Sequence, residues 1–355
     1  MRILFITTEL GKRAPGKVYE SFIDDYEKKY GKENIDIITT ECNTNSNNVT
    51  IYKRRYIHPR FRKLSVILFS VDLFDWLLAK RINKSINTTK YDIVFSLMSL
   101  HNFMPLYLGR LVKKTHKKLD WYLYSVDAVP PPLGWGESIF YRRGLIKMMR
   151  TNLKNINKFY SSNEVMLNYQ LNLLDYSFSG EKGYIHTSGK YKEKKIFAKN
   201  NDGFFNLLYT GGIYGVRRPE SLIDAFYKIS LQYENVRLYF VGTSPISVDL
   251  SKYDEVFKSK IIFVSYTDDL EKYYQLADVL IDIDADLEND VFMSSKFFNY
   301  IMINRPILSI TRENSPTYLY TMKNGLENVH FAKHQADDIE SVLKKIIKLT
   351  TDYEI

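Results

Sequence analysis

Two glycines and two arginines, placed between an expected strand and an expected helix, form the segment with the clearest potential for chemistry. The segment 209–226 reads YTGGIYGVRRPESLIDAF. Gly211 and Gly212 let a ligand approach the backbone closely, and Arg217, Arg218 and the amide-rich start of a helix supply positive charge. These features suit a phosphate group. The segment is neither a Walker A loop nor a GxGxxG motif, so an ordinary strand-to-helix turn followed by exposed arginines is the alternative.

A run of aspartates follows in the same half of the chain. Asp282, Asp284 and Asp286 form two overlapping Asp-x-Asp triplets, which is one way to hold a divalent metal ion against a diphosphate. Such triplets are frequent in acidic loops, and these run from the end of an expected strand at 279–283 toward an expected helix at 294–304. We therefore interpret the aspartates as loop residues that line or cap the site, and we expect no metal site.

Two titratable residues in the first half follow expected strands. Asp127 lies in YLYSVDAVPP, and His101 ends FSLMSLH just before an expected helix. Polar groups in such positions project from the carboxyl ends of parallel strands, where ligands bind. We take Asp127 and His101 as the candidate catalytic residues, although a lone loop histidine is more often structural. The loop from Gly11 to Gly16 (GKRAPG) is the expected acceptor loop.

The elements around these residues alternate between strand and helix in both halves, which is typical of parallel α/β sheets. The first half begins strand, loop, helix, strand, and this pattern restarts after the lysine-rich passage 191–201 (YKEKKIFAKNN). We therefore predict an α/β fold with two Rossmann-like doubly wound domains, 1–190 and 202–336, facing each other across a cleft. A terminal helix within 337–355 is expected to pack back toward the N-terminal domain.

The second half resembles the retaining glycosyltransferases of family 4 (group 1 type), which have the GT-B fold. The 209–226 segment resembles the family pattern Tyr-x-Gly-Arg, four residues, Lys-Gly, and a helix ending Ala-Phe. The family's diphosphate-binding Lys falls on Arg217, and its Arg falls on Gly212. YYQLADVLID and SSKFFNYIMINRPIL resemble the family's later strand and helix. The family's ribose-binding Glu falls on Asn299, and its second acid falls on Val291, with Asp290 one residue away.

This resemblance implies a function and a set of donor-binding residues. It implies a hexosyltransferase that retains the anomeric configuration and is independent of metal. The implied co-substrate is a UDP- or GDP-linked sugar, with no other cofactor. The implied acceptor is a glycan or polyprenyl-linked molecule in bacterial surface polysaccharide synthesis. Because the family's acids are replaced at two positions, the alternative is a catalytically degenerate partner of another transferase that binds membrane or glycan. The implied donor-binding residues are Gly211, Gly212, Arg217, Ser295, Lys296, Asn299 and Asp290.

Charge is unevenly distributed along the chain. Residues 1–200 carry 34 Lys+Arg against 18 Asp+Glu, a net charge of +16, whereas residues 201–355 carry 16 against 23, a net charge of −7. Six basic residues interleaved with aromatic ones directly precede the apolar stretch 64–78. This cluster suggests an anionic membrane surface; a solvated face and nucleic acid are the alternatives, and with no nucleic-acid motif beside it we expect no nucleic-acid partner. The predicted membrane-surface residues are Lys53, Arg54, Arg55, Arg60, Arg62 and Lys63.

Length and composition exclude several classes of protein. The 355 residues, 45% apolar and 26% charged, exclude a small binding module and a disordered chain. A single cysteine, Cys42, excludes a disulfide framework and a multi-thiolate metal site. The stretch 64–79 contains two aspartates and is too short for a bilayer span. We expect a cytoplasmic protein that is peripheral at the inner face of the cell membrane.

Overall fold

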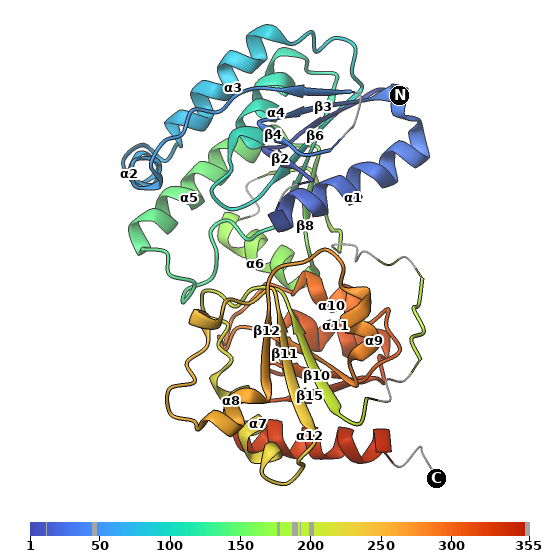
Figure 1. The fold of residues 1–355 in the computed structure, drawn as a ribbon. Coiled ribbons are helices and arrows are strands. Elements are labelled where there is room, and N and C mark those ends of the chain that lie inside the picture. Colours follow the sequence, from blue (N-terminus) through green and yellow to red (C-terminus); the bar gives the residue numbers. More distant parts are fainter. Residues whose placement is uncertain are drawn as a thin grey trace. The chain divides into compact units, whose positions relative to one another are not determined.

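The computed structural model describes residues 1–11, 13–44, 48–175, 178–186, 191, 193–198 and 202–351. The chain forms two compact units, unit 1 (1–188) and unit 2 (189–355) (Figure 1). Each unit has a parallel sheet with helices on both faces, so the predicted α/β class and the pair of doubly wound domains are confirmed. Part of the predicted linker, 191–201, lies outside the described residues.

Unit 1 is built on a seven-stranded parallel sheet in the order β5-β3-β1-β6-β7-β8-β9. The strand order reverses between β1 and β6, and this reversal is the switch point where ligands of such sheets bind. A separate two-stranded sheet pairs β2 with β4. The strands of unit 1 are β1 (Ile3–Ile6), β2 (Glu9–Leu10), β3 (Ile35–Thr39), β4 (Glu41–Cys42), β5 (Val49–Ile51), β6 (Ile93–Met98), β7 (Asp120–Ser125), β8 (Lys158–Ser161) and β9 (Glu181–Tyr184).

The helices of unit 1 cover the two faces of this sheet unequally. Tyr19 and Ile23 of α1 cover one face, together with strand residues such as Phe5 and Phe95. Apolar side chains of the later helices, among them Leu106 and Leu145, cover the other face. The helices are α1 (Arg13–Tyr30), α2 (Pro59–Phe69), α3 (Leu73–Ser85), α4 (Met104–Thr115), α5 (Ile139–Asn152) and α6 (Glu164–Leu174).

Unit 2 has a six-stranded parallel sheet in the order β12-β11-β10-β13-β14-β15, so its switch point lies between β10 and β13. Side chains of α7 and α12 pack on one face, and those of α9, α10 and α11 pack on the other. The elements are β10 (Phe205–Thr210), α7 (Glu220–Ser230), β11 (Val236–Val241), α8 (Glu255–Ser259), β12 (Ile261–Val264), α9 (Glu271–Leu276), β13 (Val279–Ile283), α10 (Ser295–Tyr300), β14 (Ile307–Ile310), α11 (Pro316–Asn324), β15 (Val329–Ala332) and α12 (Ala336–Thr351).

Two predicted elements differ from the structure. The expected acceptor loop is mostly helical, because α1 begins at Arg13 and contains Pro15 and Gly16; proline is tolerated in a first turn, whose amides have no helical acceptor. Within unit 2, Ile339, Leu343 and Ile346 of α12 are buried against the sheet; the expected packing of the terminal helix toward the N-terminal domain stays a prediction. The helix expected at 294–304 ends earlier, at Tyr300.

The apolar stretch expected to lie at a membrane surface forms two helices. Ser70, with a left-handed φ of 54°, ends α2, and the Asp72 side chain accepts hydrogen bonds from the amides of Phe74 and Asp75 to begin α3. Within the described residues, no helix has the length and hydropathy required to cross a bilayer.

Candidate functional site

The switch point of unit 2 brings together residues that are far apart in the sequence. Lys296 Nζ donates a hydrogen bond of 3.0 Å to the hydroxyl of Tyr209, and the ammonium lies 4.3 Å from the centre of that ring. A Cβ atom on Gly211, which has a φ of 96°, would lie 3.5 Å from Cε of Lys296. The lysine therefore lies against the glycine turn at the end of β10, as the sequence predicted for two residues of one site.

Helix α10 is held in this position by Tyr300. The amide of Thr210 donates a 2.9 Å hydrogen bond to the Tyr300 hydroxyl, and the Thr210 hydroxyl lies 2.8 Å from the same oxygen. Lys296 lies one turn before Tyr300 on the same helix, so this buried contact fixes the lysine relative to the end of β10. No pattern in the sequence indicated this role of Tyr300.

Arg217 is a buried cation that forms no salt bridge with an acid in the described residues. Its side chain is 6% exposed, its Nε has no hydrogen-bond partner there, and its guanidinium lies 5.7 Å from the ring centre of Tyr214. Burial acts to lower the pKa of Arg217, but Tyr214 and the carboxyls of Asp284 and Asp282 raise it above its usual value. A buried guanidinium costs free energy unless an anion compensates it, so this position favours an anionic ligand.

Asp282 is buried beside both cations of this site. Burial raises its pKa to about 7, and repulsion from Asp284 acts in the same direction, whereas Lys296, Arg217 and a contact with the Ser294 hydroxyl oppose the increase. Neither carboxyl oxygen has a hydrogen bond of ordinary geometry within the described chain. The carboxyl therefore holds its proton to a higher pH than an ordinary aspartate, which limits how far it neutralises the two cations.

The three aspartates that could have held a metal ion point to different partners. Asp282 belongs to β13, whereas Asp284 accepts a 2.8 Å hydrogen bond from the buried Thr311 hydroxyl and Asp286 pairs with Arg312 at 2.7 Å near the surface. Among the residues with described positions, no group of three potential ligands is arranged to hold a metal. The absence of a metal requirement in the reaction stays a prediction.

The remaining predicted donor-binding residues lie around the same elements. Gly212 and Ser295 are exposed, whereas Asp290 is 4% exposed and its Oδ1 accepts a 3.2 Å hydrogen bond from the Phe292 amide. Asn299 is half-buried on α10, three residues after Lys296 and so on a neighbouring part of its face. Val291, at the position of the family's second acid, is buried at 3% exposure.

In unit 1, Asp127 lies just beyond the carboxyl end of β7. Its Oδ2 accepts a 2.9 Å hydrogen bond from the amide of Leu100, which follows β6. Burial raises the pKa of Asp127, although that hydrogen bond opposes the increase. The buried Tyr19 of α1 contacts Ser99 and lies close enough to Asp127 for the carboxyl to help raise the tyrosine pKa. The sequence predicted Asp127 at this edge but gave no signal for Tyr19.

His101 is engaged through both of its ring nitrogens. Its Nδ1 lies 3.0 Å from the Tyr141 hydroxyl, and its Nε2 lies 3.2 Å from Oε1 of Glu137. Burial lowers its pKa, more than Glu137 raises it, so the ring is mainly neutral at pH 7. Lys63 also pairs with Glu137, at 2.8 Å. The side chain of His101 therefore belongs to a polar cluster with Tyr141, Glu137 and Lys63, whereas the amide of the preceding residue, Leu100, is the group that contacts Asp127.

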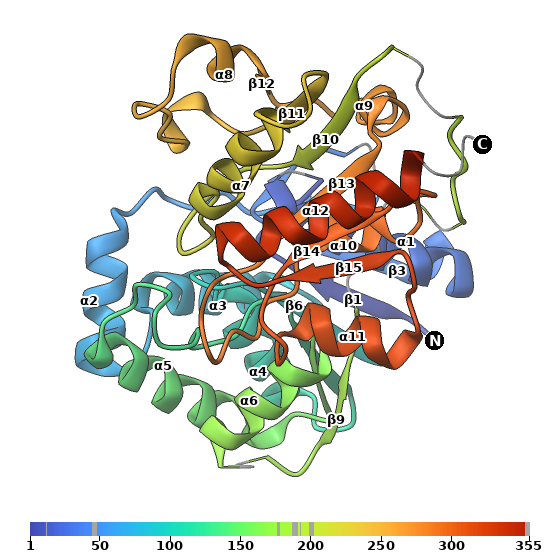
Figure 2. The same cartoon turned by 90° about the horizontal axis from the view of Figure 1, so that it is seen from below.

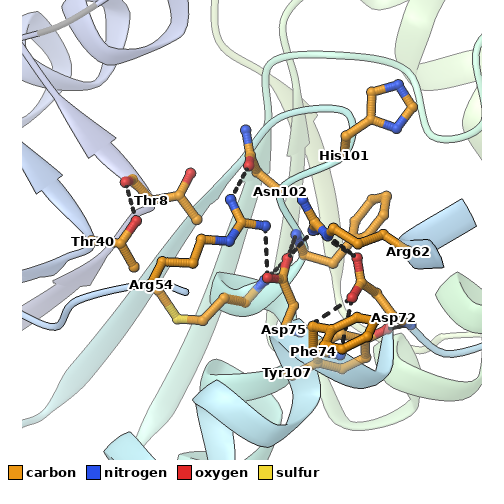
Figure 3. A network of polar contacts seen from close by, with 12 residues as sticks. Thr8, Thr40, Arg54, Arg62, Asp72, Phe74, Asp75, His101, Asn102 and Tyr107 are labelled. Carbon is orange, nitrogen blue, oxygen red and sulfur yellow. Dashed lines mark hydrogen bonds and ion pairs between the residues drawn. The ribbon is translucent and has the colours of Figure 1, made fainter. Parts of the chain in front are cut away.

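Two of the predicted membrane-surface arginines point inward (Figure 3). Arg54 pairs with Asp75 Oδ1 at 2.7 Å, and Arg62 pairs with Asp75 Oδ2 at 2.7 Å and with Asp72. Asp75 also accepts hydrogen bonds from the amides of Phe103 and Met104 at the start of α4. Arg54, Arg62 and Lys63 therefore hold unit 1 together, which leaves Lys53, Arg55 and Arg60 as the exposed cations of the predicted cluster.

Comparison with solved structures identifies the fold of this chain. No protein-family model and no curated protein matches this sequence. The apo form of the lipopolysaccharide outer core galactosyltransferase WaaB is 10% identical, with a TM-score of 0.53 and complete coverage of both chains. Sucrose-phosphate synthase from Thermosynechococcus elongatus is 12% identical, with a TM-score of 0.62, covering 99% of this chain and 90% of its own. TarM is 11% identical, with a TM-score of 0.63, covering 99% and 92%. The chain therefore has the GT-B fold.

Proposed function

We propose that this protein transfers a sugar from a nucleotide-sugar donor, bound by unit 2, to a glycan or lipid-linked acceptor, bound by unit 1. The observation that carries this proposal is the pair of cations, Arg217 and Lys296, beside the glycine turn at the switch point of unit 2. Neither forms an ion pair with an acid in the described residues. The likeness in fold to a galactosyltransferase and to sucrose-phosphate synthase supports a sugar transfer reaction.

The proposed reaction needs positive charge at this position. The bond between the anomeric carbon and the diphosphate oxygen breaks, its electron pair leaves with the diphosphate, and the acceptor oxygen forms the new bond to carbon while losing its proton. Cations held in a site that excludes water stabilise the negative charge that develops on the diphosphate. Arg217 and Lys296 would have this role, and Asn299 would hydrogen-bond the ribose.

The finer features of the reaction rest on the resemblance to family 4. It favours hexosyl transfer with retention from a UDP- or GDP-linked sugar, without metal, in the synthesis of a bacterial surface polysaccharide. Asp127 would orient the acceptor hydroxyl. His101 carries less of the proposal, because its two ring nitrogens already contact Tyr141 and Glu137.

Replacing Arg217 tests the donor site. We expect Arg217→Ala to weaken binding of the cognate nucleoside diphosphate by about 1.5 to 3 kcal/mol, because a charge-assisted contact is lost. Isothermal titration calorimetry with UDP and GDP measures this change. Lys345→Ala is the matched control, because Lys345 is an exposed cation on α12, on the face of the sheet opposite to α10, and its loss should leave affinity unchanged. Equal affinities for the Arg217→Ala variant and the parent would contradict the assignment.

A non-catalytic partner of another transferase is the second candidate. Val291 and Asn299 favour it, because they replace the two acids of the family pattern. A screen of UDP- and GDP-sugars, with and without glycan acceptors, separates the two functions. Sugar transfer or donor hydrolysis supports an enzyme, whereas nucleotide binding without any turnover supports the partner.

A further inference from the structure

Helix α2 exposes several large apolar side chains and buries the charged side chain of Arg62. Phe61, Leu64 and Leu68 are 62%, 48% and 62% exposed, and Phe69 at the end of the helix is 61% exposed. Arg62, on the opposite face, is 16% exposed and lies against Asp72 and Asp75. A surface helix ordinarily has the reverse arrangement, with its apolar face toward the core.

Two contacts fix α2 in this orientation. The ion pairs of Arg62 with the first turn of α3, drawn in Figure 3, hold its inner face. On the other side, a Cβ on Gly144 of α5 would lie 2.4 Å from the backbone oxygen of Val66, so the two helices are in backbone contact. The apolar side chains therefore cannot turn inward without breaking buried ion pairs.

Helix α5 continues the same exposed surface. Figures 1 and 2 both show α5 beside α2. Ile139 and Phe140 at its start are 60% and 67% exposed. Farther along the helix, a hollow of about 500 Å³ is lined by Arg143, Ile146, Lys147, Arg150, Thr151 and Lys154. We call the exposed side chains of α2 and α5 the α2–α5 surface.

Charge on the α2–α5 surface has one sign. The sequence has no Asp or Glu from 51 to 71 or from 138 to 160, so α2, α5 and the segments beside them contain none. Arg55 and Arg60 are exposed before and within α2, and Arg143 and Lys147 are exposed on α5. Exposed apolar side chains flanked only by cations complement a lipid surface that presents anionic phosphates above an apolar interior.

We propose that the α2–α5 surface docks on an anionic lipid bilayer. Phe61, Leu64, Leu68 and Phe140 enter the headgroup layer, and the cations, with the hollow on α5, bind lipid phosphates. A protein partner would need an apolar face with an acidic rim, whereas a bilayer supplies both features without further assumptions. This docking does not depend on sugar transfer. The membrane contact includes α5 as well as the basic residues between 53 and 63 that the sequence indicated.

Vesicle co-sedimentation of the full chain tests the proposal. Vesicles of phosphatidylglycerol and phosphatidylcholine should bind the protein, vesicles of phosphatidylcholine alone should bind it far less, and added salt should weaken binding because charge is screened over about 8 Å at physiological ionic strength. The triple variant Arg60→Gln, Arg143→Gln, Lys147→Gln should bind roughly 100-fold more weakly. The matched control changes three exposed lysines of α4 and the following turn, Lys114→Gln, Lys117→Gln and Lys118→Gln, and should bind like the parent.

The apolar part of the contact has its own variant. Phe61→Ser with Leu68→Ser should lower the partition coefficient at least tenfold, by order of magnitude, because two side chains no longer enter the interface. Unfolding midpoints and nucleotide affinities equal to those of the parent show that both variants are folded. Equal binding of the triple variant and its control overturns the proposal. A dimer in sedimentation velocity that Phe61→Ser with Leu68→Ser dissociates overturns it too, because a second copy would then cover the surface.

Discussion

At the residue scale, the protonation of Asp282 makes the unit 2 site sensitive to pH. Burial and Asp284 raise its pKa to about 7, whereas an unfolded aspartate has a pKa near 3.9. Below about pH 4 the carboxyl is protonated in both states. Between about pH 4 and 7 only the folded state keeps the proton, so the contribution of Asp282 to stability falls as pH rises and is lost above its folded pKa.

The substitution Asp282→Asn should remove this loss of stability at higher pH. We expect the parent to lose roughly 2 to 4 kcal/mol of unfolding free energy between pH 4 and pH 8 relative to the Asn variant, because Asn has the same shape but does not ionise. Urea unfolding of both proteins at several pH values measures the difference, and other titrating groups cancel because the proteins share them. Parallel pH profiles would show that Asp282 is ionised throughout this range.

The residues of the site were predictable to different degrees. Arg217 and Lys296 could be placed together because the resemblance to family 4 implies that both bind the donor, and because the carboxyl ends of parallel strands meet at one edge of the sheet. The inward direction of Arg54 and Arg62 was not predictable, because their acidic partners lie on another helix and only the assembled fold brings them close. Asp282 was interpreted as a loop residue because it begins the Asp-x-Asp run, whereas the structure includes it in β13.

At the element scale, the contact between α2 and α5 depends on one glycine. Gly144→Ala puts a methyl group 2.4 Å from the backbone oxygen of Val66. Alanine favours a helix over glycine by about 1 kcal/mol, but the backbone clash forces the helices apart, so we expect a net loss of about 1 to 3 kcal/mol in unfolding free energy.

Denaturant unfolding of Gly144→Ala and the parent measures this loss. Arg143→Ala, the exposed neighbour on the same helix, is the control and should change stability by less than about 0.5 kcal/mol. If Gly144→Ala is as stable as the parent, the helices have room to separate at no cost and the orientation of α2 is less rigid than its contacts indicate.

Apolar periodicity predicted the order of strands and helices well, because buried parallel strands are short apolar runs whose local signal is strong. Helix limits and the packing of α12 were less predictable. Pro15 and Gly16 indicate a loop in most contexts, yet α1 includes both in its first turns. The apolar stripe of α12 shows that one face is buried but does not specify the surface that buries it.

At the scale of the whole molecule, the proposed donor site lies in the acidic half of the chain, although the diphosphate of a donor is itself negatively charged. The half of the chain that contains the proposed donor site has a net charge of −7, with 23 acids against 16 basic residues. A metal ion held by aspartates would be an ordinary solution in such a half. Instead, the aspartates at 282, 284 and 286 diverge, whereas Arg217 and Lys296 lie at the switch point without an acidic ion-pair partner in the described chain.

Transfer should therefore survive the removal of divalent metal. We expect turnover of the cognate nucleotide sugar to be unchanged in EDTA and unaffected by added Mg²⁺ or Mn²⁺, because the two side-chain cations already stabilise the leaving diphosphate. Steady-state rates after dialysis against chelator, with and without each metal, measure this. Asp284→Asn and Asp286→Asn are informative companions, since metal ligands would show an increased metal requirement on substitution and loop residues would not. Complete loss of turnover in EDTA that Mn²⁺ or Mg²⁺ restores would instead assign the leaving-group charge to a metal.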